Sequence, residues 1–149
     1  MIDVKFPIKV KDLAKVVDQA NVNPHTMDDN KLIANDNRLI AEFMGYDSYE
    51  FRGHTMFIYE EDNHRTDIDL HYHTSWEWLM PVVDTINDYT NDKGYAVYSV
   101  EIDTNHVTIR RGLDTAIVVD RPQADSYMEM IYLAVAEFAR RFHQYGQSL

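Results

Sequence analysis

The segment of residues 67–81, DIDLHYHTSWEWLMP, constrains the fold of this chain more than any other stretch. Its first half alternates polar and apolar side chains, which is the pattern of a strand with one buried face. Its second half, from Thr74 to Glu77, matches the capping box that begins many helices. We therefore expect a strand over 67–73 that leads directly into a helix. Pro81 lies inside that helix and predicts either a kink or a restart.

Other strands are predicted where aromatic and β-branched side chains gather between turn-forming residues. The segments are 55–59, 95–102, 106–110 and 115–119. A charged stretch over 60–65 is typical of a turn, so a hairpin from Met56 to Tyr72 is expected. Together with 67–73, these segments predict an antiparallel sheet of about five strands.

Three more helices are predicted from hydrophobic periodicity. Residues 10–20 form a short amphipathic pattern. The duplicated DNKLIA (29–34) and DNRLIA (36–41) either share one helix, or the first copy only approaches a helix that the second begins; Gly45 is placed to end it. A second capping box, SYME at 126–129, opens the last helix, whose apolar face carries Ile131, Val135, Phe138 and Phe142.

The chain of 149 residues has the size of one domain. We expect a single α+β domain over 1–149, a small α/β sandwich in which an antiparallel sheet packs against helices. Residues 1–45 would form a mostly helical lead-in, and residues 46–149 would supply the sheet and the two main helices.

Composition narrows the classes of partner. Lys and Arg number 14 against 25 Asp and Glu, and the resulting net charge of −11 argues against a general nucleic-acid binder. No cysteine is present, so disulfides and thiolate metal sites are excluded. The amino end lacks the apolar core of a signal peptide, and no stretch reaches the ~20 apolar residues of a membrane span. A cytoplasmic protein without a membrane partner is expected.

Two segments carry a family resemblance: residues 37–45, NRLIAEFMG, and residues 72–83, YHTSWEWLMPVV. In this order they resemble a group of small uncharacterised proteins from tailed bacteriophages and Bacteroidetes-type bacterial genomes. The resemblance implies a small α+β sandwich of viral or mobile-element origin, and it transfers no catalytic residue. The duplicated DNKLIA, the leading forty-odd residues and the Asp67/Asp69 pair are not features of that group, so a function that depends on them would be particular to this protein.

Four polar side chains would share the outer face of the strand over 67–73: Asp67, Asp69, His71 and His73. Neighbours on that face would lie roughly 6.5 to 7 Å apart, close enough for adjacent pairs to share a metal. Oxygen and imidazole ligands suit zinc, manganese or non-haem iron. An ordinary solvated strand face has the same composition and is the simpler interpretation.

Tryptophan and arginine supply the candidate binding residues. Trp76 and Trp78 fall on different faces of the predicted helix, so Trp78, which shares a face with Val82, suits the core, and Trp76 suits a ligand or partner. Arg110, Arg111 and Arg121 form the main basic concentration and could hold an anionic ligand, or simply balance neighbouring acids.

No Gly-x-Ser-x-Gly, Gly-rich phosphate loop or His-Glu-x-x-His motif occurs. Together with the phage origin that the resemblance implies, this absence makes a non-enzymatic phage or prophage accessory protein, without a cofactor, the leading hypothesis. It would bind a host macromolecule or a small signalling ligand to blunt a host defence. The alternative is a metal-dependent hydrolase or nuclease built on the 67–73 face. A self-associating module, in which apolar helix faces form a homo-oligomer, is a third possibility.

Overall fold

The computed structural model describes residues 29–60 and 63–145, so the helix expected over 10–20 lies outside the described residues. The described part contains three α-helices: α2 (Asp29–Phe43), α3 (Trp76–Asp88) and α4 (Tyr127–Tyr145). Its six strands are β1 (Ser48–Phe51), β2 (His54–Glu60), β3 (Asn63–Thr66), β4 (Tyr98–Ile102), β5 (His106–Arg111) and β6 (Asp114–Asp120). Two 3₁₀ turns, η1 (Asp67–Asp69) and η2 (Arg121–Gln123), complete it.

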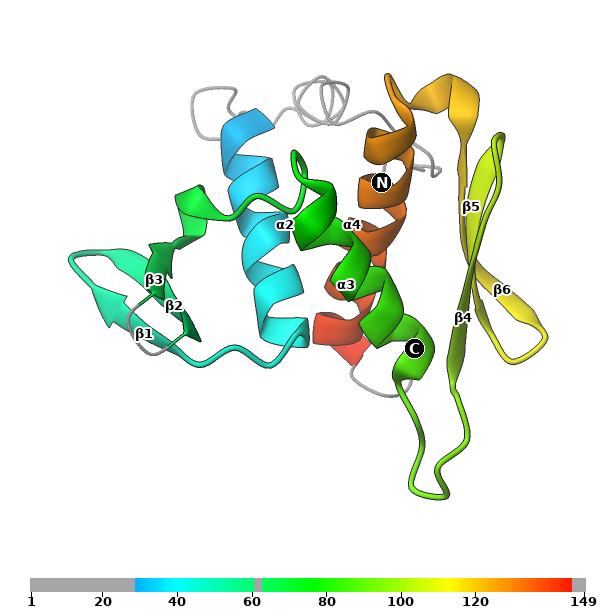
Figure 1. The fold of residues 1–149 in the computed structure, drawn as a ribbon, viewed down its shortest axis with the longest axis horizontal. Coiled ribbons are helices and arrows are strands. Elements are labelled where there is room, and N and C mark those ends of the chain that lie inside the picture. Colours follow the sequence, from blue (N-terminus) through cyan, green and yellow to red (C-terminus); the bar gives the residue numbers. More distant parts are fainter. Residues whose placement is uncertain (1–28, 61–62, 146–149) are drawn as a thin grey trace.

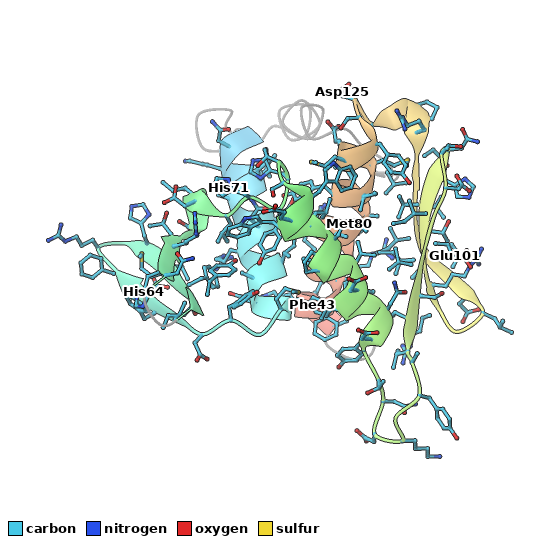
Figure 2. The ribbon with its side chains drawn as sticks, in the orientation of Figure 1. Phe43, His64, His71, Met80, Glu101 and Asp125 are labelled. Carbon is cyan, nitrogen blue, oxygen red and sulfur yellow. The ribbon has the colours of Figure 1, made fainter. Side chains whose placement is uncertain are left out.

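The helices lie between two antiparallel sheets (Figure 1). The sheet β1-β2-β3 extends from one side and the sheet β4-β5-β6 covers the other, so His64 on β3 and Glu101 on β4 lie on opposite sides of the helices (Figure 2). Helix α4 packs against α2 and against β5 and β6, and α3 packs against β4. Among the residues described, no helix has the length and apolar character needed to cross a bilayer.

The α+β class is confirmed, but the prediction of one sheet of about five strands is wrong: within residues 29–60 and 63–145 the strands number six and form two sheets of three. The strands expected over 95–102, 106–110 and 115–119 correspond to β4, β5 and β6, which pair in sequence order. The strand over 55–59 corresponds to β2. The end of the stretch predicted as a turn, 60–65, instead belongs to β3 (Asn63–Thr66), which pairs with β2.

The strand expected over 67–73 is also wrong, because the chain forms η1 and then a turn. Strand β2 begins at His54, so few of its residues remain to pair with the chain beyond Thr66, which lies opposite Met56. Local hydrogen bonds form in place of pairing with a neighbouring strand. The Thr66 hydroxyl donates to the Asp69 carboxylate, and the amides of Thr74 and Ser75 donate to the His71 carbonyl. The expected hairpin from Met56 to Tyr72 therefore ends at Thr66.

Helix α3 begins at Trp76 after Ser75, so Thr74 does not cap it, and no side-chain cap is formed. The helix continues through Pro81 to Asp88, and the expected restart is therefore wrong. Pro81 is exposed, while the buried face of α3 carries Leu79, Val82, Val83 and Ile86. The proline ring thus lies away from the core that holds the helix in place.

Both DNKLIA-type copies lie in α2, which selects the first of the two alternatives. Gly45 has φ +81°, the left-handed conformation expected after a helix. The second capping box is half formed, since the Glu129 amide donates to the Ser126 hydroxyl over 3.0 Å. Helix α4 buries a continuous run from Met130 to Ala136 because α2 covers one side of it and the sheet β4-β5-β6 the other.

Candidate functional site

The four side chains predicted to share one strand face point to separate neighbours. Asp67 lies 3.7 Å from the His54 ring nitrogen, and Asp69 accepts from Thr66. The His71 ring packs edge-on against Trp78, with centroids 5.4 Å apart. Among the residues described, no group of three or more His, Cys, Asp or Glu side chains is arranged to hold a metal. The expected face is absent because the strand that would carry it is a 3₁₀ turn followed by a loop.

His73 instead joins a buried network centred on Asn37, which is 1% exposed. The Asn37 amide group donates to the Leu70 carbonyl and lies 3.0 Å from His73 Nδ1, while its oxygen accepts from the Tyr132 hydroxyl over 2.9 Å. Burial, and secondarily His71, lowers the pKa of His73, so the neutral ring can accept at Nδ1. The network fastens the loop before α3 onto α2 and α4.

A cleft of about 310 Å³ lies beside this network, lined in part by Ile33, Ala34 and Ile68. Its polar lining consists of Asn30, Asn37, Asp67 and His73. Two of the four predicted metal ligands therefore face one cavity, but their nearest partners are within the fold, as described above. The signal that sequence reasoning missed is Asn37 itself, which lies with Asp36 between Ile33 and Ile40 on the buried side of α2.

A second network joins α2 to α4 through ionic groups. Arg140 lies 3.3 Å from Asp36 and 3.3 Å from Glu137, and Glu137 also accepts from Arg141 over 2.8 Å. Burial raises the pKa of Asp36 to about 6, against the opposing influence of Arg140. These groups are paired with each other and are placed to hold the helices together.

Trp76 and Arg121, two of the predicted binding residues, lie on one surface. Trp76, the first residue of α3, is 41% exposed, and its ring centroid lies 6.0 Å from that of Tyr127, the first residue of α4. The Arg121 guanidinium, from η2, lies 5.7 Å from the centroid of the same Tyr127 ring. We call these three residues the Trp76 surface. Asp125, which Figure 2 labels, lies two residues before Tyr127 and so just before α4.

Arg110 and Arg111 do not belong to this surface. The Arg121 amide pairs with the Asn105 carbonyl at the start of β5, whereas Arg110 lies five residues further along. At a rise of about 3.4 Å per residue, Arg110 lies about 17 Å along β5 from Asn105, the residue that Arg121 contacts. Arg110 donates to Glu101 and to the Thr115 hydroxyl, so the expected basic concentration is divided and Arg110 balances a neighbouring acid.

The tryptophans do take different faces, as expected. Trp78 is half-buried and packs against the core, with Tyr72 edge-on at 5.3 Å, while Trp76 faces outward.

Comparison of the chain with protein-family models, with curated proteins and with solved structures finds no match to any of them. The function must therefore be argued from the geometry of the chain itself.

Proposed function

We propose that this protein is a non-enzymatic accessory protein of a phage or prophage, and that it binds a host protein through the Trp76 surface. The observation that carries the proposal is the convergence of Trp76, Tyr127 and Arg121 from three separate elements. Trp, Tyr and Arg are the side chains most enriched among residues that dominate binding energy. The resemblance of residues 37–45 and 72–83 to proteins of tailed bacteriophages and Bacteroidetes-type bacterial genomes supports a viral or mobile-element origin. A counter-defence role in the host cytoplasm is part of the proposal.

The Trp76 surface is mounted on rigid elements. Trp76 begins α3 and Tyr127 begins α4, and both helices bury their other faces in the core. The Tyr127 ring touches both of its neighbours and so holds the indole and the guanidinium beside each other. Side chains held in place before binding lose less conformational entropy on association. This arrangement favours specific recognition over adventitious exposure of one aromatic ring.

The charge of the chain indicates the kind of partner. A net charge of −11 accelerates encounter with a basic protein surface and slows encounter with an acidic one. Arg121 supplies a cation at the contact itself, where it can pair with a carboxylate of the partner. The proposed partner is therefore a host protein that is basic around the contact, with an apolar pocket for Trp76. Association should weaken as salt concentration rises.

The proposal is tested by photo-crosslinking in host cells. A photoreactive phenylalanine analogue in place of Tyr127 is expected to give a discrete adduct with one host protein. The same analogue in place of Leu113, which is 98% exposed in the β5–β6 turn, is the matched control and should not give that adduct. Equal labelling at both positions would contradict the proposal, as would an adduct that survives replacement of Trp76 by alanine at unchanged yield.

The alternative, a metal-dependent hydrolase or nuclease, depended on one strand face on which adjacent pairs of Asp67, Asp69, His71 and His73 could share a metal. The structure directs these side chains to different neighbours, as shown by the contacts of Asp69 and His73. No specific observation favours this alternative, and we do not propose it.

A further inference from the structure

A pocket lined largely by aromatic rings opens beside Trp78, separate from the Trp76 surface. It has a volume of about 220 Å³. Its lining consists of Met44, Tyr46, Tyr59, Tyr72, Glu77, Trp78 and Pro81. We call it the Trp78 pocket. The linker after α2, strand β2, the loop before α3 and α3 itself all contribute to it.

The rings of the Trp78 pocket are packed against one another. The centroid of Tyr59 lies 4.1 Å from that of Tyr46 and 4.9 Å from that of Trp78. The Tyr59 and Tyr72 hydroxyls form a hydrogen bond of 2.8 Å, which fixes the orientation of both rings. Burial raises the pKa of Tyr59 to about 12, so the phenol stays neutral at physiological pH. The lining of the pocket therefore contains four neutral aromatic rings, and the face of each such ring carries partial negative charge.

The charges of the residues that line the Trp78 pocket indicate the class of ligand that the pocket fits. Glu77 is the charged residue in the lining, and no lysine or arginine contributes to it. Neutral aromatic rings attract a cation through their quadrupole, and a nearby carboxylate adds to that attraction. The Arg65 guanidinium lies 5.3 Å from the Trp78 centroid without lining the pocket, and its positive charge offsets part of this attraction.

We propose that the Trp78 pocket binds a methylated ammonium group. Such a cation has few or no N–H donors to satisfy, so it suits a wall of rings better than a primary ammonium, which needs hydrogen-bond acceptors around it. Tyr46, Tyr59 and Trp78 supply the ring contacts, and Glu77 supplies the counter-charge. The group could come from a free choline-like molecule or from a trimethyllysine side chain of a partner protein, because both present the same chemistry.

The test is a set of NMR titrations of the full chain with choline, with a trimethyllysine peptide and with 3,3-dimethylbutan-1-ol. The alcohol is the neutral isostere of choline and isolates the effect of charge. Choline is expected to shift the Trp78 indole signal and to bind at least about tenfold more tightly than the alcohol, as a desolvated cation–π contact implies. Tighter binding of the peptide would assign the group to a protein, and equal binding would assign it to a free molecule.

Glu77→Gln is the decisive variant, since Glu77 is exposed and its loss spares the core. It should weaken choline binding about three- to tenfold and leave binding of the alcohol unchanged. Asp84→Asn, at another exposed acidic position of α3, is the matched control and should change neither. Equal binding of choline and its neutral isostere would overturn the proposal, as would the absence of any shift at Trp78 with millimolar choline. Neither result bears on the Trp76 surface.

Discussion

Replacing Asn37 with alanine is expected to destabilise the protein strongly, because this buried amide makes three contacts at once. Loss of the side chain leaves the Leu70 carbonyl and the Tyr132 hydroxyl without their partners. A buried polar group left unpaired costs about 1–3 kcal/mol, so the two together cost about 2–6 kcal/mol. This is a large share of the 5–15 kcal/mol by which such domains are typically stable.

The effect is measured by urea unfolding followed by far-ultraviolet circular dichroism. Asn35→Ala serves as the matched control, since Asn35 lies on the same helix but is exposed, where substitutions usually change stability by about 0.5 kcal/mol or less. Tyr132→Phe removes one hydrogen bond and keeps the ring, and is expected to cost about 1–2 kcal/mol. If Asn37→Ala lowered the free energy of unfolding by no more than Asn35→Ala, the account of this network would be wrong.

Three further perturbations test other parts of the fold. The pKa of Asp36 is raised to about 6, so the native state binds more protons than the unfolded state between about pH 4 and 6. The free energy of unfolding should therefore fall as pH rises through this window. Asp36→Asn should flatten this pH dependence, measured by urea unfolding at each pH. Phe138 is fully buried with the Tyr98 ring edge-on at 4.9 Å, so Phe138→Ala should cost about 3–5 kcal/mol in the same assay. Gly45→Ala places a side chain at φ +81° in open space, and the thermal midpoint should fall by an amount equivalent to about 1–2 kcal/mol.

The parts of the fold that could be predicted are those in which local signals agree. Residues 114–120 are rich in β-branched side chains and residues 127–145 carry strong helical periodicity, and they form β6 and α4 close to the expected bounds. Gly45 and Ser126 act at helix ends as their types predict. In these cases propensity, pattern and capping chemistry all favour the same structure.

Residues 67–73 show why alternation alone did not suffice. Leu70 and Tyr72 are buried as the pattern predicts, yet Ile68 is 66% exposed because η1 rotates it outward. Whether a polar–apolar alternation becomes a strand depends on a partner strand of sufficient length, and β2 does not supply one. The division into two sheets likewise depends on how α2, α3 and α4 pack, which no local pattern encodes.

Two of the three residues of the proposed Trp76 surface carry a signal in the sequence. Trp76 and Arg121 were both identified, but their meeting requires Tyr127, which lies 51 residues after Trp76 in the sequence. Side chains from such distant positions come together only through the packing of α3, α4 and η2. The aromatic lining of the Trp78 pocket was missed for the same reason, since Tyr46 and Tyr59 lie far from Trp78 in the chain.

The most direct test of the proposed function is the dissociation constant of the crosslinked host protein for three forms of the purified chain. Trp76→Ala is expected to raise that constant at least about thirtyfold, the effect of losing a side chain worth 2 kcal/mol or more at an interface. Leu113→Ser, at an exposed apolar position on another part of the surface, is expected to leave it unchanged. If Trp76→Ala, with an unchanged circular dichroism spectrum, bound the partner as tightly as the natural chain, the Trp76 surface would not be the binding site.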